Sequence, residues 1–376
     1  MIQAIAETKS LADILRARIL RDGPLTFRDW MNAALYDPIY GYYRRNAQQI
    51  WGRRGDYRTS PERSELFAAT FARYFATVYR ELETPAHFTI VEIGGGEGQF
   101  ALGVLQTLRS YFPEVFAATH YIFDEIGEVA NLAARDRLAE FIGRVSFEST
   151  GELEIECGVV FTNELLDAFP VHRVTMLDGE PGEYSVDIDE QEQFVWKLGA
   201  LSRPEIATYL TANDIELARG NIAEINLEIE PWLAKIAQYL KRGRVITVDY
   251  GAESSELYST ERATGTLRGF KQQRFVENVL ATPGDHDLTS TINWSAVKRA
   301  GEIVGLKTIT FERLDKFLIE HGLLKQLELV SENLPDSSRL KLSSTAREMI
   351  LPDGMAASFQ VLVQQKTSAT ASDRNA

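Results

Sequence analysis

From residue 88 onward the chain alternates strand-like and helix-like runs, and this alternation constrains its fold more than any other feature. The β-rich runs and the amphipathic runs between them cover, in order, residues 88–94, 100–112, 119–125, 127–141, 157–164 and 242–251. Strands separated by helices of this length form βαβ units, which build a parallel sheet. We therefore predict an α/β fold around a mostly parallel sheet, with a last strand at 359–366.

The flanking segments follow other patterns. Helical periodicity marks residues 8–21 and the stretch after Thr26, Ser60-Pro61 predicts a helix start, and residues 311–351 are also predicted to be helical. We divide the chain into a helical cap with an active-site segment at 1–80, a core at 81–366 with insertions at about 173–240 and 311–351, and a disordered tail at 367–376.

Composition excludes several classes of function. The 54 acidic residues exceed the 40 basic ones, and the formal net charge of −14 argues against nucleic acid or an anionic membrane as a general partner. Cys157 is the only cysteine and the five histidines lack metal-ligand spacing, so we expect no metal and no intramolecular disulfide. No apolar stretch reaches about 20 residues and no secretory signal is recognisable, so we expect a cytoplasmic protein without a membrane span.

One acidic run interrupts the alternating core. Between Asp178 and Glu192 the segment carries seven acidic residues and no Lys or Arg, within a region of predicted hairpin strands at 173–230. The simpler interpretation is a solvated face of an inserted element, and the alternative is a docking surface for a basic partner.

The strongest chemical signal is the glycine loop Gly94–Gly98, which follows one predicted strand and precedes a helix. Glycines let the backbone turn sharply and approach a ligand, and the helix N-terminus offers free N–H groups. A dinucleotide fingerprint would need a third glycine at position 99, where this chain has Gln99, which argues against an NAD(P)-dependent oxidoreductase. The spacing of Glu92, Gly94, Gly96 and Gly98 instead resembles motif I of the Rossmann-like S-adenosylmethionine (SAM) methyltransferases. A tight turn without a ligand is the alternative.

A carboxylate at the end of the next strand is expected to accept hydrogen bonds from the ribose of an adenosine cofactor. Asp124 ends the run YIFD and is our first candidate, with Glu125 as the neighbouring alternative.

Four further segments lie in order around the glycine loop. They are GPLTFRDWMNAALYDPIYGYY (23–43), GDYRTSPERSELFA (55–68), TNELLDAFPVHRV (162–174) and GTLRGFKQQRFVENVLATPGDHDLTSTINW (265–294). With the loop between them, this order resembles the mitochondrial dysfunction protein A family, which includes the mitochondrial complex I assembly-factor methyltransferases and many bacterial members. The resemblance covers about residues 20–365 and identifies the chain as a bacterial member.

This resemblance implies a class I SAM-dependent methyltransferase fold, Rossmann-like, with a seven-stranded mostly parallel sheet, an N-terminal helical cap and insertions. It implies SAM as cofactor. For the mitochondrial members it implies symmetric dimethylation of an arginine on a complex I subunit. We therefore expect methylation of arginine on a protein substrate, with a respiratory-complex subunit as one candidate partner.

The resemblance also assigns residues. It places Glu92, Gly94, Gly96, Gly98, Asp124 and Asn163 at the cofactor. The expected substrate-binding residues are Asp56, Thr59, Glu62 and His286. The chain departs from the family pattern near Gln273 and at Ser290, and these departures support an alternative function, an assembly or interaction protein that binds SAM with weak or no catalysis. A small-molecule methyltransferase is a third possibility.

An arginine acceptor would need carboxylates, because guanidinium is a permanently charged planar fork of donors. Glu164 lies at the end of a predicted parallel strand, where open α/β sheets bind their ligands, and is our first candidate for a catalytic residue. Asp167 is the second, although it could instead cap the turn that follows.

Overall fold

The structure is a computed structural model that describes residues 10–44, 65–152, 154–177, 179–272, 274–332, 334–351 and 354–367. The chain divides into two compact units, each built from segments far apart in the sequence. Unit 1 comprises residues 1–57, 168–228 and 253–291, and unit 2 comprises 58–167, 229–252 and 292–376. The predicted helix start at Ser60-Pro61 and the predicted disorder from residue 368 lie outside the described residues.

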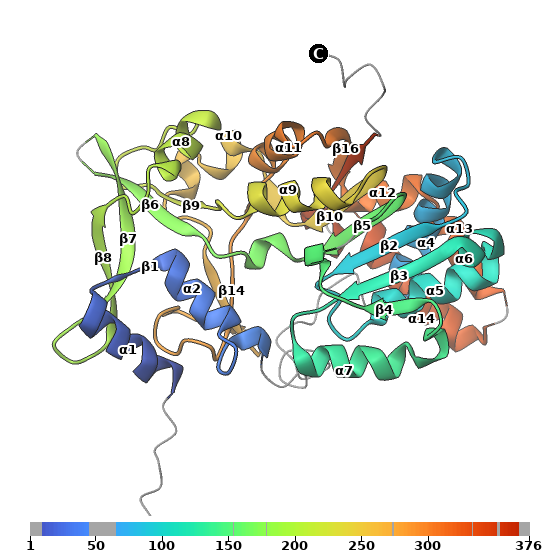
Figure 1. The fold of residues 1–376 in the computed structure, drawn as a ribbon, viewed down its shortest axis with the longest axis horizontal. Coiled ribbons are helices and arrows are strands. Elements are labelled where there is room, and N and C mark those ends of the chain that lie inside the picture. The colour runs from blue at the N-terminus through green and yellow to red at the C-terminus, as the bar shows by residue number, and fades with distance from the viewer. Residues whose placement is uncertain are drawn as a thin grey trace, which may run out of the picture. The chain divides into compact units, whose positions relative to one another are not determined.

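Unit 2 is built on a seven-stranded sheet in the order β16-β17-β10-β5-β2-β3-β4 (Figure 1). Its strands are β2 (Phe88–Ile93), β3 (Thr119–Asp124), β4 (Val145–Phe147), β5 (Gly158–Asn163), β10 (Gly243–Asp249), β16 (Lys307–Arg313) and β17 (Gln360–Lys366). The strands from β10 to β4 run parallel, whereas β17 is antiparallel to both of its neighbours. The predicted seven-stranded, mostly parallel sheet is confirmed.

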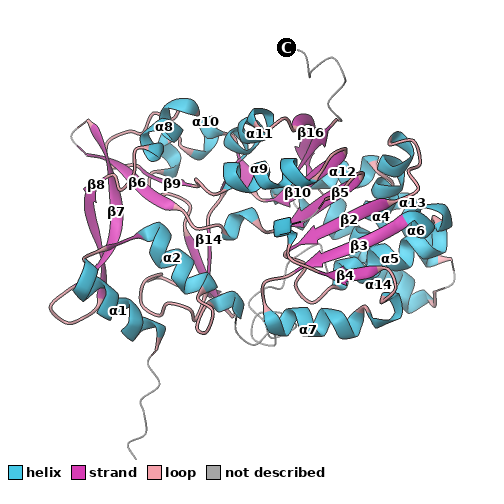
Figure 2. Ribbon diagram, viewed as in Figure 1, coloured by secondary structure: helices cyan, strands magenta, loops and turns pink. Residues whose placement is uncertain are grey.

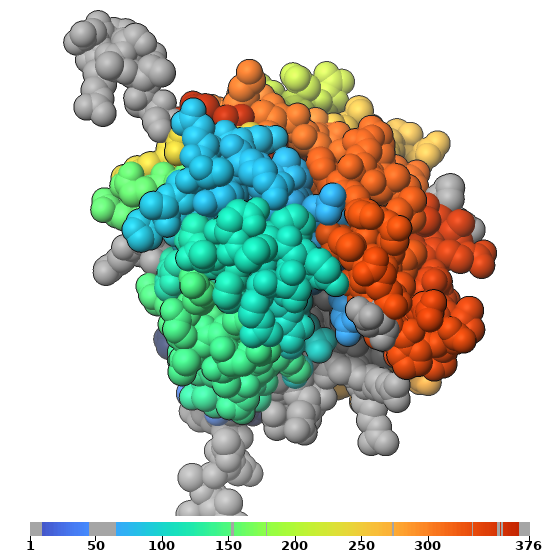
Figure 3. All heavy atoms as spheres, turned by 90° about the vertical axis from the view of Figure 1, so that its right-hand side faces the viewer, coloured from blue at the N-terminus to red at the C-terminus, as the bar shows by residue number. Residues whose placement is uncertain are grey.

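Helices surround this sheet (Figure 2). They are α4 (Glu65–Glu81), α5 (Gln99–Tyr111), α6 (Pro113–Ala118), α7 (Glu128–Arg137), α9 (Ile229–Tyr239), α11 (Trp294–Ile303), α12 (Leu314–Glu320), α13 (Leu323–Ser331) and α14 (Asp336–Ile350). The predicted helices at 100–112 and 127–141 are confirmed. The predicted helical segment 311–351 is confirmed from Leu314 onward, whereas residues 311–313 end strand β16. Figure 3 shows the segment from α12 to α14, in orange, beside the blue and teal segments, in agreement with the packing of α13 on α4.

Aromatic side chains fill the space between α4, α5 and the sheet. Phe100 of α5 stacks on Phe161 of β5 with ring centroids 4.3 Å apart, and Phe71 of α4 lies 4.9 Å from the same Phe161 ring. All three side chains are buried. Because stacked aromatic pairs add to the free energy gained from burial alone, this cluster fixes the helices against the strands that carry the site.

Unit 1 contains two small sheets. The first has the order β1-β7-β6-β9, with β8 paired to β7, and the second has the order β13-β12-β14. Their strands are β1 (Leu25–Thr26), β6 (His172–Leu177), β7 (Glu180–Ile188), β8 (Phe194–Ala200), β9 (Ile222–Ile225), β12 (Arg268–Lys271), β13 (Arg274–Phe275) and β14 (Asp287–Thr289). The antiparallel pairs β6–β7 and β7–β8 are the hairpin strands predicted for 173–230. In unit 2, two short strands, β11 (Gly251–Ala252) and β15 (Ile292–Asn293), pair in parallel.

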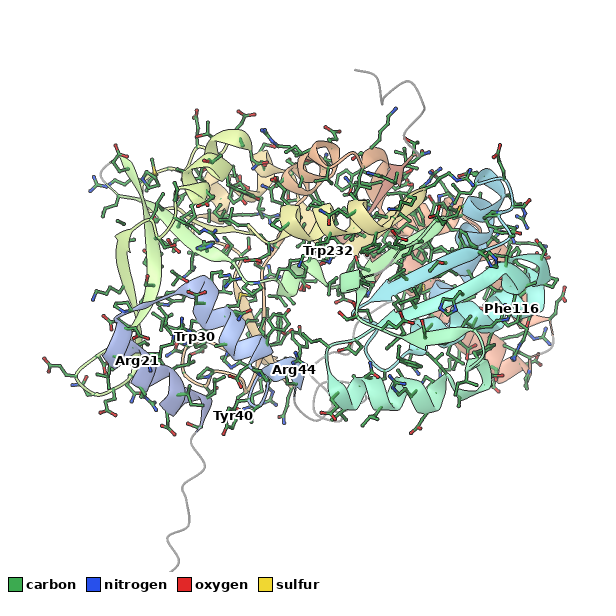
Figure 4. All side chains as sticks on the ribbon, viewed as in Figure 1. Arg21, Trp30, Tyr40, Arg44, Phe116 and Trp232 are labelled. Atoms are coloured by element: carbon green, nitrogen blue, oxygen red, sulfur yellow. The ribbon has the colours of Figure 1, made fainter. Side chains whose placement is uncertain are left out.

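The helices of unit 1 are α1 (Leu11–Asp22), α2 (Phe27–Tyr36), α8 (Glu205–Ala212) and α10 (Ser254–Leu257). Ser10 and Asp13 form a capping box at the start of α1, which explains where this helix begins. Trp30 of α2 is fully buried and lies among the side chains of unit 1 in Figure 4, in contact with the Phe27 and Phe194 rings.

The acidic run is not a uniformly solvated face. Glu183 is 1% exposed, and its Oε1 lies 2.7 Å from Nδ1 of the buried His172. Its Oε2 accepts a hydrogen bond from the backbone N–H of Ser202. Glu183 is therefore part of the interior of unit 1, whereas Glu190 and Glu192 of the same run are exposed.

Candidate functional site

The glycine loop connects the end of β2 to the start of α5. Gly94, Gly96 and Gly98 all have positive φ angles, of 75°, 55° and 76°. Residues with a Cβ atom are strained in this region, so the alternate glycines are required by the path of the backbone. The predicted strand–loop–helix context of the motif is confirmed by these elements.

The loop packs closely on the sheet beneath it. A Cβ atom on Gly95 would lie 2.3 Å from Cε2 of Phe123 and 2.9 Å from Cδ of Glu92. Glu92 is 3% exposed, and its Oε2 accepts a hydrogen bond of 2.7 Å from the Tyr121 hydroxyl. The Glu92 side chain thus lies under the glycine loop, paired with a neighbouring strand.

Two consecutive carboxylates meet the loop at the end of β3. The backbone N–H of Gly94 donates to the Asp124 carbonyl, and the N–H of Gly96 donates to Oε2 of Glu125 at 2.9 Å. Oε1 of Glu125 accepts from the Gly127 N–H, whereas the Asp124 carboxylate accepts from the Thr150 N–H. Glu125, the alternative in the sequence, is therefore the carboxylate bonded to the loop itself. Asp124 orders the segment after β4.

These features fit a nucleoside cofactor such as SAM. The loop is a cradle without side chains at four of its five positions, and it leads into the N-terminus of the 13-residue helix α5. Backbone N–H groups at such a terminus bind polar and anionic groups, and the two carboxylates beside it can accept hydrogen bonds from ribose hydroxyls.

A second acidic cluster gathers at the ends of β5 and β10. Asp167 lies in a 3-10 turn (Leu166–Ala168) that follows β5, and Asp249 is the last residue of β10. Oδ2 of Asp249 accepts the backbone N–H groups of Leu166 and Asp167, at 3.1 and 3.3 Å. Its Oδ1 accepts the N–H of Tyr250, whose hydroxyl donates to Oδ2 of Asp167. Asp249 at the end of β10 and Tyr250 directly after it therefore position the predicted catalytic Asp167.

Burial changes the protonation of this cluster. Complete burial, and secondly the nearby Glu164 carboxylate, raise the pKa of Asp249 to about 8, although three backbone N–H donors act in the opposite direction. Burial, followed by the charge of Asp167, raises the pKa of Tyr250 well above its usual value. The Tyr250 hydroxyl thus stays protonated at neutral pH, as its role as a donor to Asp167 requires.

Glu164 has an unusual backbone conformation. Its φ is +49°, a region that non-glycine residues rarely adopt. Its N–H donates to the Val248 carbonyl of β10, and Nδ2 of Asn163 lies 3.4 Å from its Oε1. Strained residues held by their surroundings cluster at functional sites, and this conformation places Glu164 beside Asp249 and Asp167. The structure therefore brings together Asn163, Glu164 and Asp167, as their spacing at a strand end predicts.

Of the four predicted substrate-binding residues, His286 alone lies in the part of the chain that the structure describes. Asp56, Thr59 and Glu62 lie outside the described residues. His286 belongs to unit 1 and is 1% exposed. Its ring nitrogens face the Val279 carbonyl at 3.1 Å and the Thr282 hydroxyl at 3.4 Å, and burial lowers its pKa. A role for His286 in substrate binding stays a prediction.

Asp249 and Tyr250 were not among the site residues predicted from the sequence. The sequence does contain a feature that indicates them, because Asp249 ends a predicted parallel strand just as Asn163 does. A completely buried carboxylate that ties two strand ends together is visible only once the neighbouring strands are known.

The described part of the chain has neither a metal-binding cluster nor a membrane-spanning helix. No group of three or more His, Cys, Asp or Glu side chains there is arranged to hold a metal ion. No helix there is long and apolar enough to cross a membrane.

Comparisons with known proteins agree with this geometry. Residues 70–312 match a family model described as "Putative S-adenosyl-L-methionine-dependent methyltransferase". The mitochondrial protein arginine methyltransferase NDUFAF7 homolog of Drosophila melanogaster is 27% identical over 322 residues, which cover 79% of this chain and 71% of that protein. The mitochondrial protein arginine methyltransferase NDUFAF7 of Danio rerio is 24% identical over 377 residues, which cover 94% of this chain and 86% of that protein.

A solved structure from Burkholderia thailandensis has a similar fold. It is described as a "likely methyl transferase" bound to S-adenosyl-homocysteine, with a TM-score of 0.83 and 28% identity. The match covers 94% of this chain and 91% of that chain. A native structure from the same organism gives a TM-score of 0.81 at the same identity.

Proposed function

Because the chain belongs to the family of SAM-dependent methyltransferases whose model it matches, we propose that its methyl acceptor is an arginine side chain of a protein. The chain is an enzyme with the class I methyltransferase fold, and SAM is its cofactor. The names of the relatives from fly and zebrafish support an arginine on a protein as the acceptor.

In this proposal the glycine loop and the carboxylates after β3 hold SAM. Gly94, Gly96 and Gly98 give the cofactor close access to the backbone, and Asp124 and Glu125 accept hydrogen bonds from its ribose. Glu92 supports the loop from below and Asn163 borders it at the end of β5. SAM supplies a methyl group on a sulfonium, a leaving group that needs no acid assistance.

The cluster of three carboxyl groups at the ends of β5 and β10 is the observation that supports arginine as the methyl acceptor. Glu164, Asp167 and Asp249 lie together with the Tyr250 hydroxyl, so three carboxyl groups meet at the ends of these two strands. Such a site favours a cation, and a guanidinium presents paired donors that match carboxylates in bidentate geometry. Holding the acceptor in line with the methyl group can contribute about 7–11 kcal/mol to lowering the barrier.

Methylation of a guanidinium nitrogen forms one N–C bond and releases one proton, so the site needs a proton acceptor. We assign this role to Asp167, which is held by the Tyr250 hydroxyl and by the hydrogen bond of its own N–H to Asp249. Glu164, whose carboxylate lies beside Asn163, is assigned to bind and orient the guanidinium.

The test is a methyl-transfer assay with radiolabelled SAM and a cell lysate, followed by acid hydrolysis of the labelled protein and separation of its amino acids. Label in methylated arginine supports the proposal. The Glu164→Gln variant should bind S-adenosyl-homocysteine like the wild type and lose transfer. Lys197→Gln, a change at an exposed residue on β8, is the matched control.

Other outcomes separate the alternatives. Label in lysine or in small molecules would overturn the assignment of arginine on a protein. Cofactor binding without transfer to any acceptor would favour a SAM-binding assembly protein over an active enzyme. A respiratory-complex subunit as the target and a cytoplasmic location stay predictions, which mass spectrometry of the labelled protein and cell fractionation would test.

A further inference from the structure

The segment from β3 to α7 contacts the glycine loop at three points. The Asp124 carbonyl accepts the N–H of Gly94, the Glu125 carboxylate accepts the N–H of Gly96, and the Arg137 side chain reaches the loop from the last residue of α7. A loop with three glycines at positive φ has many alternative conformations, so its shape depends on such contacts.

Arg137 makes the contact farthest along the loop. Its Nη1 donates to the backbone carbonyl of Glu97, and its Nη2 lies 3.4 Å from Oε2 of the same residue. The Arg137 and Glu97 side chains are 25% and 27% exposed, so the pair is partly shielded from water. Directly beside this contact, a Cβ atom on Gly98 would lie 3.0 Å from Cβ of Ala134, which shows that α7 packs against the end of the loop.

We infer that Arg137 is a positioning residue for the cofactor, which acts by holding the Glu97 carbonyl and so fixing the loop in the conformation that binds SAM. Arg137 acts through the backbone of Glu97. The inference rests on the proposal that the glycine loop binds SAM. Arg137 belongs neither to the glycine motif nor to the carboxylates at the strand ends. It lies on a helix, α7, for which the sequence shows no motif.

The guanidinium is suited to this role. It is charged at all ordinary pH values and presents several N–H donors in a rigid plane, so one side chain can bind the carbonyl and the carboxylate of Glu97 together. A lysine would keep the charge and lose this fork, and a glutamine would lose both.

Titration of S-adenosyl-homocysteine into Arg137 variants tests the inference. Arg137→Gln should raise the dissociation constant about tenfold, the effect expected when one charge-assisted hydrogen bond is lost. Arg137→Lys should raise the dissociation constant by a smaller factor, because lysine keeps the positive charge. The KM for SAM should rise in parallel, whereas kcat at saturating SAM should stay within about twofold of the wild type.

Arg135→Gln is the matched control, because Arg135 lies on the same helix and binds Asn131 and the Phe147 ring instead of the loop. It should bind S-adenosyl-homocysteine within twofold of the wild type. Glu97→Gln should weaken binding less than Arg137→Gln, since the backbone contact remains. An equal loss of affinity in Glu97→Gln and Arg137→Gln would overturn the role assigned to the Glu97 carbonyl.

Arg137→Gln could weaken binding simply by lowering the stability of the whole protein. Amide hydrogen exchange distinguishes this effect from a local change in the glycine loop. The Gly98 amide should exchange faster in the variant, whereas that of Val91 in β2 should not change. An unchanged Gly98 rate, or a dissociation constant within twofold of the wild type, would overturn the inference.

Gly96→Val separates this inference from the proposed cofactor site. Gly96 has a φ of 55°, which valine does not tolerate, so the loop would lose its shape. If Gly96→Val loses binding and Arg137→Gln binds normally, the positioning role of Arg137 is rejected and the glycine loop stays the cofactor site. Normal binding in both variants would reject the glycine loop as the site.

Discussion

At the scale of single residues, the site depends on how one carboxylate is held. Tyr250 donates to Oδ2 of Asp167, and this hydrogen bond fixes the side chain that we assign to accept a proton. Tyr250→Phe keeps the ring and its packing on Phe359 and removes only the donor. We expect kcat to fall on the order of tenfold, the cost of one hydrogen bond to a charged group.

Binding of S-adenosyl-homocysteine should not change in Tyr250→Phe, because the cofactor loop lies on other strands. The control is Tyr79→Phe, since Tyr79 is also buried in unit 2 but packs on the Phe88 ring. A kcat for Tyr250→Phe equal to that of Tyr79→Phe would mean that Asp167 needs no help from the hydroxyl.

Asp249 gives the folded protein a specific dependence on pH. Its pKa is raised to about 8 from a value near 3.8, so between these pH values the folded state holds a proton that the unfolded state releases. The resulting contribution to stability is complete below about pH 3.8 and is lost as the pH rises to about 8.

Asp249→Asn should remove this contribution. Urea unfolding at pH 5, 6, 7 and 8 measures the slope of the unfolding free energy against pH for both proteins. The wild type should lose more stability with rising pH than the variant, by a difference that corresponds to at most one proton. Parallel slopes would show that Asp249 is already ionised in the folded state.

At the scale of elements, glycines at the first residues of β5 and β10 lie directly against the backbone of a neighbouring strand. A Cβ atom on Gly158 of β5 would lie 2.0 Å from the Thr89 carbonyl oxygen of β2. A Cβ atom on Gly243 of β10 would lie 1.9 Å from the Gly158 carbonyl oxygen. The clashing atoms are backbone atoms of neighbouring strands, which cannot move without breaking the parallel ladder.

Gly158→Ala should therefore destabilise the fold by roughly 2–4 kcal/mol, in the range of severe overpacking. The control is Gly143→Ala, where a Cβ atom would meet no atom within 4 Å. Urea unfolding of both variants at one pH measures the difference. Equal stability of the two would show that the sheet adjusts its strand spacing at this point.

The elements also show what sequence patterns can predict. The parallel strands β2, β3, β5 and β10 and the helices α5 and α7 were predictable, because buried runs and helical periodicity mark these segments in the sequence. The three-residue strand β4 was not predicted. Strand β16 was not predicted, since KTITFER carries charges at both ends and its pairing with β17 joins segments about 50 residues apart. The choice between Asp124 and Glu125 was also open, because only the folded loop shows which carboxylate faces Gly96.

At the scale of the whole molecule, the proposed cofactor and acceptor groups all belong to unit 2. The glycine loop, the β3 carboxylates and the acidic cluster come from residues 92–167 and 249–250, although the unit 1 segments 168–228 and 253–291 interrupt this unit in the sequence. The proposed chemistry thus lies on the parallel sheet, and unit 1 has a core of its own that contains Trp30 and Phe194.

This division predicts where the cofactor will protect the chain. With S-adenosyl-homocysteine at 100 times its dissociation constant, mass action stabilises the binding state by about 2.7 kcal/mol. Amide hydrogen exchange should slow in Gly94–Gly98 and around Glu125–Gly127, because these segments form the proposed cradle. Exchange in the β7–β8 hairpin should stay the same, since its hydrogen bonds lie within unit 1. Gly96→Val, which should not bind, supplies the control for nonspecific effects of the ligand. Slower exchange in β7–β8 without slower exchange in the glycine loop would show that the cofactor binds outside unit 2.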